Sequence, residues 1–468
     1  MAEESSSVQQ KALKINQDAR KYGTFAEIGA GQEVARWFFH AGKAAGTVAK
    51  SISAYDMAIS DGLYGPAGHY VSRQRLEAML DTESHSLVAG LNDTRGQSNC
   101  LFVFADTAAT HTHSQREAGQ AWLGLRFQTE PRGAPSQVII HVEMLDPVTV
   151  GQQEALGVVG VNLIYGAFYY LDDPGHLIGT LMDGLNRRRI EVDMIKFSGP
   201  AFAAVDNRLM SLQLVEQGLT DAAMFTADRE VVEPAEVLYK KPVLIERGSF
   251  RPVTNVTLDL LDRATQQLQR DSTLPTEDMV TIMEMTLHNL MSGNAVDHQD
   301  FLARADILGA LGKMVMISSY TRFDRVTSYL RHYTSNWIGM AVGIPTLSKI
   351  FEESYYTELE GGILEGLGRL FSGQVKLFAY PTMRPGASEL TTAENLQVKP
   401  SLQHLYRHLL ENGFIESIRD FDPAGLNFTP GSVLEKIQAG DPTWKKLVPP
   451  QAADVIEREG LFGCCRGA

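Results

Sequence analysis

The sequence has no hydrophobic run long enough to cross a membrane as a helix. Its most apolar stretch, LGVVGVNLIYGAFYYL at 156–171, is interrupted by glycine and asparagine, whereas a membrane span needs about 18–20 apolar residues in succession. This stretch predicts a buried strand followed by the start of a helix. With 44% hydrophobic and 21% charged residues among 468, the chain has the composition of a globular protein with a sizeable core, and we expect no contact with membranes.

Cysteine is scarce, and an apolar N-terminal segment is missing. Of the three cysteines, Cys100 stands alone, while Cys464 and Cys465 are adjacent near the C-terminal end and cannot easily bridge each other. The first residues, MAEESSSVQQKALKINQDARKYG, are polar and have the pattern of neither a secretory signal nor a transit peptide. The sequence therefore predicts a cytoplasmic protein.

Positive charge is also in short supply. The chain has 42 Lys and Arg against 56 Asp and Glu, which gives a formal net charge of −14 at pH 7. An extended nucleic-acid surface is therefore excluded, because phosphate contacts need clustered Lys and Arg. One local basic cluster exists, and it consists of Lys240, Lys241, Arg247, Arg251 and Arg263. This cluster favours a small anionic ligand as the partner.

Apolar runs alternate with amphipathic stretches in the C-terminal half. Strand-like and helix-like segments follow one another at 313–318, 322–333, 337–342, 345–370 and 375–380. Continuous apolar runs between amphipathic helices are typical of a parallel sheet that is buried on both faces. We therefore predict an α/β domain with a doubly wound, mostly parallel sheet over 236–395.

The rest of the chain is less regular. Strand-like segments at 137–145 and 189–197 and a capped amphipathic helix at 206–218 predict a second α/β or α+β domain of unknown role before the first. The predicted division is a polar N-terminal segment at 1–20, a mixed domain at 21–235, the doubly wound domain at 236–395 and a helical C-terminal region with a tail at 396–468.

The segment KPVLIERGSFRPVTNVTLDLLDRA at 241–264 has the pattern of a strand, a turn and the start of a helix. Such a junction brings free backbone N–H groups and the positive end of a helix dipole to one point, which suits a phosphate. Gly248 would permit close approach of the backbone, Pro252 would stiffen the turn, and Thr254 or Asn255 could cap the helix. On spacing alone, the alternative is a tight turn that binds nothing.

Residues 248–264 resemble the first signature of the adenylyltransferases that make dephospho-coenzyme A and the nicotinamide dinucleotides, approximately G-S-F-D-P-V-T-N-G-H-L-D-L-I-E-R-A. The agreeing residues are Gly248, Ser249, Phe250, Pro252, Val253, Thr254, Asn255, Leu258, Asp259, Leu260, Arg263 and Ala264. The resemblance implies a Rossmann-like nucleotidyltransferase domain that uses ATP with Mg²⁺ and transfers a nucleotidyl group to a mononucleotide or a phosphate ester. It also implies that Gly248, Ser249, Phe250, Thr254 and Asn255 surround the nucleotide.

Three of the departures from this signature affect its chemistry. Arg251 replaces the aspartate, Val256 the glycine, and Thr257 the histidine that holds the transferring phosphate. Loss of one such donor typically lowers a rate by about 10²- to 10³-fold. If transfer survives, Thr257 offers only a hydroxyl, and Arg251, Arg247 or a lysine at 240–241 would have to supply the positive charge.

A second phosphate-binding signature of these enzymes, similar to I-S-S-T-x-x-R, has a partial counterpart in ISSYTRF at 317–323. Ser318 and Ser319 agree with it, and Arg322 comes one residue early. The alternative is that the two serines end a strand and Thr321 caps the next helix.

The whole chain also resembles a family of uncharacterised bacterial proteins of about this length, some of which are labelled nicotinate-nucleotide adenylyltransferase. The segments that carry this resemblance are TFAEIGAGQEVARWFF, SAYD, SGP and DNRLMSLQLV. The first contains Gly29 and Gly31 in a G-x-G arrangement that could begin a dinucleotide-binding helix. The third glycine of that fingerprint is absent, so a helix start with small residues for packing is the stronger interpretation.

Histidines suggest one further site. Asp106, His111 and His113 are predicted just beyond an apolar strand, and His141 with Glu143 lies on a later one. Two histidines at this spacing could ligate a metal with a carboxylate, although a solvent-facing polar loop explains them more simply.

Three functions follow from these patterns. The first is a nucleotide- or phosphate-binding protein with a degenerate adenylyltransferase motif. The second is a non-catalytic structural or assembly protein on the same scaffold, for which a homo-oligomer is expected. The third is a metal-dependent enzyme that uses His111 and His113.

Overall fold

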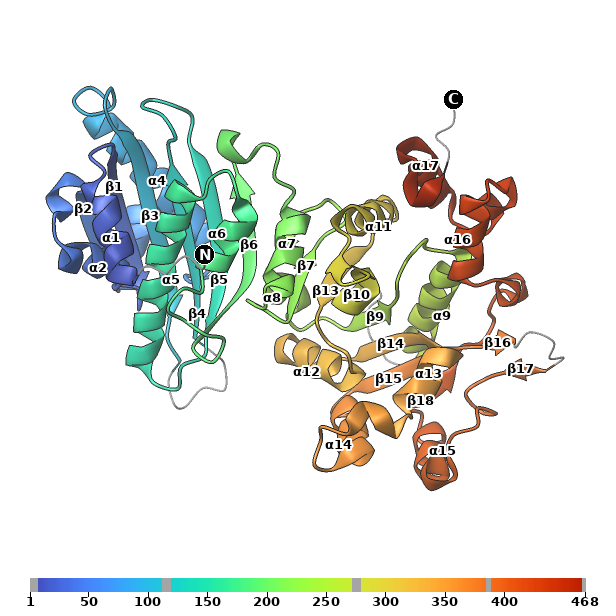
Figure 1. Cartoon of the computed structure of the whole chain (residues 1–468). Helices are drawn as coiled ribbons and strands as arrows, with labels where there is room; N and C mark the ends of the chain where they lie inside the picture. Colours follow the sequence, from blue (N-terminus) through green and yellow to red (C-terminus); the bar gives the residue numbers. More distant parts are fainter. Residues whose placement is uncertain (1–6, 112–118, 272–278, 384–388, 465–468) are drawn as a thin grey trace. The chain divides into compact units, whose positions relative to one another are not determined.

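The computed structural model describes residues 7–111, 119–271, 279–383 and 389–464. The chain divides into two compact units, Met1–Asp221 and Ala222–Ala468, and each unit has its own large sheet with helices packed on it (Figure 1). Both units are therefore α/β structures, as the sequence predicts. Among the described helices, none has the combination of length and apolar character that a membrane-spanning segment requires.

The N-terminal unit is built on a six-stranded sheet with the order β2-β1-β3-β4-β5-β6. The strands β2, β1 and β3 are parallel, and β4, β5 and β6 continue as an antiparallel meander. Their bounds are β1 Lys21–Gly29, β2 Val48–Ala54, β3 Cys100–Ala109, β4 Gly119–Phe127, β5 Ser136–Met144 and β6 Ile190–Ser198. The strands expected at 137–145 and 189–197 are confirmed as β5 and β6.

Helices cover both faces of this sheet. They are α1 Val8–Gln17, α2 Val34–Ala41, α3 Met57–Tyr64, α4 Arg73–Leu91, α5 Thr149–Tyr169, α6 Pro174–Thr180 and α7 Asn207–Glu216. α4 lies on one face, where Leu76 and Leu80 contact Gly124 of β4, and α5 lies on the other, where Gly160 approaches Phe104 of β3. The helix expected at 206–218 is confirmed as α7, which Asp206 caps.

One prediction for this unit is wrong. The stretch at 156–171 is not a strand followed by a helix start, because α5 runs through it as one helix whose residues are mostly buried. A helix that is apolar all round is a buried helix, and periodicity cannot distinguish a short segment of it from a buried strand.

The C-terminal unit is built on an eight-stranded sheet with the order β18-β15-β14-β9-β10-β13-β7-β8. The bounds are β7 Ala222–Phe225, β8 Val231–Val232, β9 Val243–Arg247, β10 Val280–Thr286, β13 Met314–Ser318, β14 Ile338–Gly343, β15 Val375–Tyr380 and β18 Ile415–Ser417. Six neighbouring strands of this sheet are parallel, namely β18, β15, β14, β9, β10 and β13. The strands β7 and β8 add an antiparallel edge. When the six parallel strands are numbered by their order in the chain, they lie across the sheet in the order 3-2-1-4-5-6. This is the doubly wound arrangement of dinucleotide-binding folds.

The helices of this unit are α8 Pro234–Leu238, α9 Asn255–Asp271, α10 Leu287–Leu290, α11 His298–Ala310, α12 Phe323–Tyr333, α13 Ile344–Ile350, α14 Gly362–Leu370, α15 Gln403–Glu411, α16 Pro430–Gln438 and α17 Pro450–Glu459. Short hairpins, β11 Met291–Ser292 with β12 Ala295–Val296 and β16 Thr382–Met383 with β17 Leu390–Thr391, lie outside the large sheet. The segment at 345–370 is not a single helix, because a 3₁₀ turn at Glu353–Tyr356 separates α13 from α14.

The boundaries between domains also differ from the expected ones. The second unit begins at Ala222, not at 236, because β7 pairs with β13 of the doubly wound sheet. Residues 396–468 belong to the same unit, because β18 pairs with β15. Short strands and helices are easily assigned to the wrong side of a boundary when only local patterns are available.

Candidate functional site

The turn after β9 has the expected position. β9 ends at Arg247 and α9 begins at Asn255, so the predicted strand, turn and helix are confirmed. Phe250 is buried at a positive φ of 50°, and a Cβ added to Gly248 would lie 2.7 Å from the Phe250 ring. Glycine is therefore needed at 248 to seat this ring, which fills the space beside the turn.

The amides at the start of α9 have partners within the chain. The Asn255 amide donates to the Leu447 carbonyl at 3.0 Å, and the Asn255 side chain donates to the Lys446 carbonyl at 3.0 Å. The Thr257 amide faces the Thr254 hydroxyl at 3.5 Å, and the Thr254 amide faces the Thr257 hydroxyl at 3.5 Å. The expectation of several free N–H groups here is therefore wrong for these residues, because the C-terminal segment and the Thr254–Thr257 pair cover the helix start.

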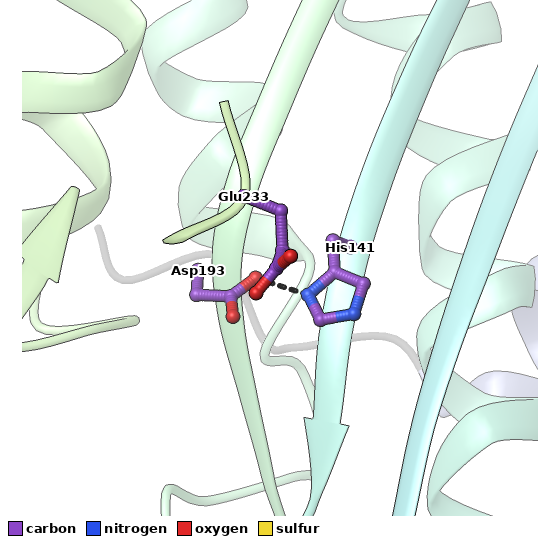
Figure 2. Close-up of side chains that lie close together, drawn as sticks. All are labelled: His141, Asp193 and Glu233. Carbon is purple, nitrogen blue, oxygen red and sulfur yellow. Dashed lines mark hydrogen bonds and ion pairs between the residues drawn. The ribbon is translucent and has the colours of Figure 1, made fainter. Parts of the chain in front are cut away.

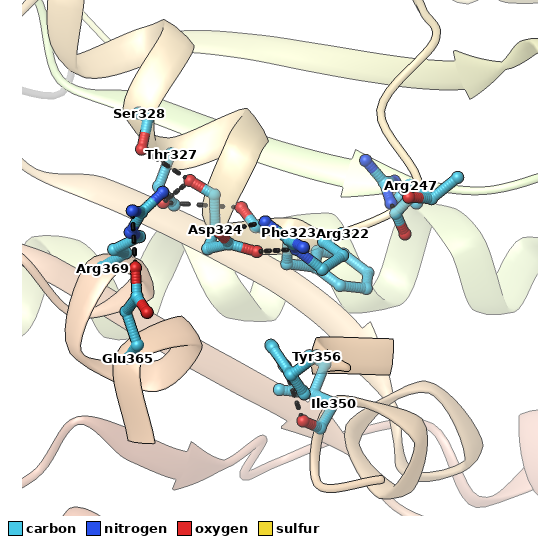
Figure 3. Close-up of polar contacts among 11 residues, drawn as sticks. Arg247, Arg322, Phe323, Asp324, Thr327, Ser328, Ile350, Tyr356, Glu365 and Arg369 are labelled. Atoms are coloured by element: carbon cyan, nitrogen blue, oxygen red, sulfur yellow. Dashed lines mark hydrogen bonds and ion pairs between the residues drawn. The ribbon is translucent and has the colours of Figure 1, made fainter. Parts of the chain in front are cut away.

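Arg247 belongs to a cluster that joins the ends of three strands. Its Nε and Nη2 donate to both carboxylate oxygens of Glu284, at 2.8 and 2.7 Å, and the Ser318 hydroxyl donates to Glu284 Oε1 at 2.6 Å. Its Nη1 donates to the Thr321 carbonyl at 3.2 Å, and its guanidinium lies 4.4 Å from the centre of the Phe323 ring (Figure 3). We call Arg247, Glu284 and Ser318 the strand-end cluster.

Arg251 is held differently. Its Nε donates to Asp300 Oδ1 at 2.7 Å, and its side chain remains 39% exposed. Asp300 also pairs with Arg304, and Arg304 donates to the Ser249 carbonyl at 3.0 Å. Within the described residues, no hydrogen bond is made by the Nη groups of Arg251. Arg251 therefore keeps a planar pair of donors for a ligand, whereas Arg247 does not.

The second candidate signature lies at the same edge of the sheet. Ser318 ends β13, Ser319 is exposed beyond it, and Arg322 donates to both carboxylate oxygens of Asp324, at 2.9 and 3.3 Å (Figure 3). This hydrogen bonding raises the pKa of Arg322. Thr321 does not cap α12, because Arg322 occupies the N-cap position and makes no side-chain cap bond.

The structure thus brings together most of the predicted site residues. The turn residues Gly248, Ser249 and Arg251 and the segment with Ser319 and Arg322 follow strands whose carboxyl ends lie along one edge of the sheet. The sequence analysis missed the carboxylates that pair with the basic residues. For Glu284 a signal existed, because a single charge within the apolar run TIMEMT predicts a buried and paired carboxylate.

Thr257 does not take the place of a catalytic histidine in this arrangement. It is only 7% exposed, and its hydroxyl faces Thr254. A buried neutral hydroxyl with a partner of its own cannot supply positive charge to a phosphate.

Glu246 is a second missed residue of this unit. It precedes Arg247 on β9 and points to the opposite face of the sheet. It is buried, and its Oε2 has no hydrogen-bond partner among the described residues. Burial raises the pKa of Glu246 well above its ordinary value, and the charge of Lys313 opposes this in part.

The predicted metal site of the N-terminal unit includes a residue that the structure does not describe. His113 lies outside the described residues. Asp106 lies within β3, not beyond it, and the described residues contain no group of three potential metal ligands that includes His111 or Asp106. His111 is held through its amide, which donates to the Gln152 side chain at 2.9 Å. The metal-dependent hypothesis therefore stays a prediction.

His141 has a carboxylate partner within the same sheet. Its Nδ1 lies 2.7 Å from Asp193 Oδ1 (Figure 2), and its ring packs against Trp122 with a centroid distance of 4.9 Å. β5 and β6 carry the two polar residues side by side, because His141 is paired with Met194 just where the register shifts. This contact orients the imidazole.

The G-x-G loop has the predicted strand and helix on its two sides. β1 ends at Gly29 and α2 begins at Val34. A Cβ added to Gly31 would lie 2.2 Å from Asp106 Oδ1. The glycine at 31 therefore allows the loop backbone to close over a buried aspartate, and no dinucleotide is needed to explain it.

Comparisons with known proteins add little. No protein-family model and no curated protein matches the sequence. Among solved structures, similarity is found to competence/damage inducible protein CihA from Agrobacterium tumefaciens, with 14% identity, a TM-score of 0.26, and coverage of 35% of this chain and 97% of the other. A competence-damaged protein (CinA) superfamily protein from Klebsiella pneumoniae is similar at 11% identity and a TM-score of 0.28, over 35% of this chain and 99% of the other. A competence or damage-inducible protein from Enterobacter asburiae has 12% identity and a TM-score of 0.26, over 34% and 96%. Similarity at this level supports no conclusion about activity.

Proposed function

We propose that the C-terminal unit binds a nucleotide or another phosphate ester at the carboxyl edge of its parallel strands, without transferring an adenylyl group. One observation carries the proposal: the strand order reverses direction between β9 and β14. In open α/β sheets, ligands bind outside the carboxyl ends of the strands at such a switch point. The turn at 248–254 follows β9 at this position.

Arg251 is the residue best suited to contact the phosphate. Its guanidinium is partly exposed and uses only Nε for Asp300, and a guanidinium offers two parallel donors that match a phosphate. Ser249 is exposed beside it. By contrast, Arg247 and Ser318 are engaged by Glu284, so they would support the edge and not hold the ligand.

The absence of transfer is proposed from Thr257. The resemblance implies a histidine at this position, and the buried Thr257 hydroxyl cannot stabilise developing phosphate charge as a cationic donor would. If ATP is the ligand, Mg²⁺ would arrive on its phosphates, because the nearby carboxylates of Glu284 and Asp300 already pair with arginines.

The alternative is a non-catalytic structural or assembly protein on the same scaffold. The coverage of the α9 start by Lys446 and Leu447 favours it, because this contact uses the amide that a phosphate would otherwise approach. A homo-oligomer is expected in that case. Light scattering, which measures the oligomeric state, and the melting temperature with nucleotide together distinguish the two proposals. A monomer whose melting temperature rises with nucleotide supports the ligand-binding function.

The test is a thermal shift measurement with Mg²⁺-ATP, with a dinucleotide and with inorganic phosphate. A ligand at about 100 times its Kd stabilises a protein by about 2.7 kcal/mol, so millimolar nucleotide is expected to raise the melting temperature clearly. The Arg251→Ala variant is expected to lose most of this shift. Its own stability should change little, because Asp300 keeps Arg304 as a partner.

Arg229→Ala is the matched control. Arg229 also pairs with an aspartate of α11, Asp306, at 3.0 Å, but it follows the end of β7, which lies beside the start of β13 at the opposite edge of the sheet. This variant should keep the full nucleotide shift. Absence of a shift with every nucleotide at millimolar concentration would contradict ligand binding, and turnover of ATP with a mononucleotide would contradict the loss of transfer.

A further inference from the structure

Two carboxylates lie side by side inside the N-terminal unit. Glu27 of β1 and Asp106 of β3 are direct partners in a parallel strand pair, so their side chains point to the same face of the sheet. They are 2% and 0% exposed. Two like charges on neighbouring side chains in a medium of low dielectric constant repel each other strongly.

The two carboxylates differ in their hydrogen bonds. Glu27 accepts from the Val34 amide at 2.8 Å and from the Ala35 amide at 3.2 Å, which are the first amides of α2. Neither oxygen of Asp106 has a hydrogen-bond partner among the described residues, and Asp106 faces the backbone of Gly31. The amides and the helix dipole stabilise negative charge on Glu27, and nothing comparable stabilises it on Asp106.

The electrostatics point the same way. Burial raises the pKa of Asp106 well above its ordinary value, and the charge of Glu27 raises it further. Burial also raises the pKa of Glu27 to about 7, the Val34 and Ala35 amides oppose the rise, and the charge of Glu33 adds to it.

Among the described residues, the elements around the pair place no compensating positive charge against it. From α2, Glu33 faces it, and Glu33 is itself paired with Arg36 at 3.0 Å. From α5, the uncharged Gln153 donates to the Ala30 carbonyl of the loop at 3.2 Å. The parallel neighbour β2 contributes Ser53, opposite Glu27, and β4 contributes Leu123, opposite Asp106.

A proton is a better counter-charge than a metal ion. Ca²⁺ and Mg²⁺ require about six or more oxygen ligands. Both oxygens of Glu27 already accept amides, and within the described residues no third metal-binding side chain joins this pair. A carboxylic acid, in contrast, needs only one acceptor, and Glu27 is the direct neighbour of Asp106 in the adjacent strand.

We propose that Asp106 is held as a neutral carboxylic acid whose O–H donates a hydrogen bond to Glu27, and that the pair is a pH-sensitive latch on the 29–33 loop and the first turn of α2. When the proton leaves to water, two adjacent carboxylates remain under the loop. Their repulsion moves Glu27 away from the Val34 and Ala35 amides, and the loop opens. This function is separate from ligand binding by the C-terminal unit.

The direction of the pH effect follows from the shifts. Both pKa values are raised in the folded state, so the folded protein binds more protons than the unfolded chain, and its stability falls as the pH rises. The fall begins near the ordinary carboxyl values, continues through about pH 7 as Glu27 titrates, and extends higher for Asp106.

Infrared difference spectroscopy and hydrogen exchange of the full chain test the latch. At pH 7, the protonated carboxylic acids of the wild type are expected to give a carbonyl band. In Asp106→Asn this band is expected to lose the contribution of Asp106, while the contribution of Glu246 remains. Exchange at Val34 and Ala35 should accelerate above pH 7 by more than the intrinsic rate in the wild type. In Asp106→Asn the side-chain amide still donates to Glu27 and cannot ionise, so the extra acceleration should be lost.

Asp56→Asn is the matched control. Asp56 is an exposed aspartate of the same unit that caps α3, and asparagine caps equally well, so this variant should keep both the band and the pH-dependent exchange. If Asp106→Asn does not fold, Glu27→Gln and ¹³C carboxyl titration of the wild type decide instead. A carboxyl carbon of Asp106 that is fully ionised at pH 7, or an unchanged pH dependence in Asp106→Asn, would overturn the latch.

Discussion

Replacing Glu284 with alanine is expected to lower the free energy of unfolding of the C-terminal unit by about 3–5 kcal/mol, which is the usual cost of removing one partner of a buried ion pair. Glu284 is fully buried, and the Arg247 side chain is only 10% exposed. Without the carboxylate, the guanidinium would remain buried without its partner, and the Ser318 hydroxyl would lose its acceptor. Urea denaturation followed by circular dichroism and tryptophan fluorescence measures the loss.

Two further variants test whether the loss of stability comes from the unpaired arginine. Glu353→Ala removes a carboxylate from an exposed pair with Lys399, and it should change stability little, because exposed ion pairs contribute little. Replacing Arg247 and Glu284 together with methionine should recover much of the loss, because no unpaired charge is left. A double variant as unstable as Glu284→Ala would show that the cost arises from packing and not from the orphaned arginine.

Replacing Gly31 with alanine is expected to destabilise the N-terminal unit by about 2–3 kcal/mol, in the upper part of the range for overpacking a filled site. The new Cβ would lie 2.2 Å from Asp106 Oδ1 and within 2.9 Å of two more atoms of that carboxyl group. Asp106 is fully buried, so it has no solvent-filled space to move into. Urea denaturation of the N-terminal transition measures the effect.

The cause can be isolated with a second substitution. Adding Asp106→Ala to Gly31→Ala removes the clashing atoms, so the double variant should lose less than the sum of the two single effects. Gly90→Ala is the control in the same unit, because nothing lies within 4 Å of its added Cβ and alanine is the better helix former within α4. Simple additivity of Gly31→Ala and Asp106→Ala would contradict the close approach.

Local patterns in the sequence were sufficient for a large part of the fold. The apolar runs at 313–318, 337–342 and 375–380 correspond to β13, β14 and β15. These strands were predictable because a strand buried on both faces needs apolar side chains at nearly every position. The strand, turn and helix around Gly248 were predictable for a similar reason. Each depends on residues that are neighbours in the chain.

By itself, then, the sequence determined the α/β class, the parallel character of the C-terminal sheet and the position of the turn at its central strand. Only the tertiary structure decided what the charged residues of that turn do. Glu284 reaches Arg247 across 37 residues of chain, and Leu447 reaches the start of α9 from the far end of the unit. It likewise decided that Glu27 and Asp106 share one position in adjacent strands. The physical reason is that strand register and packing between distant segments select these partners, whereas periodicity and turn chemistry report only on residues close in sequence.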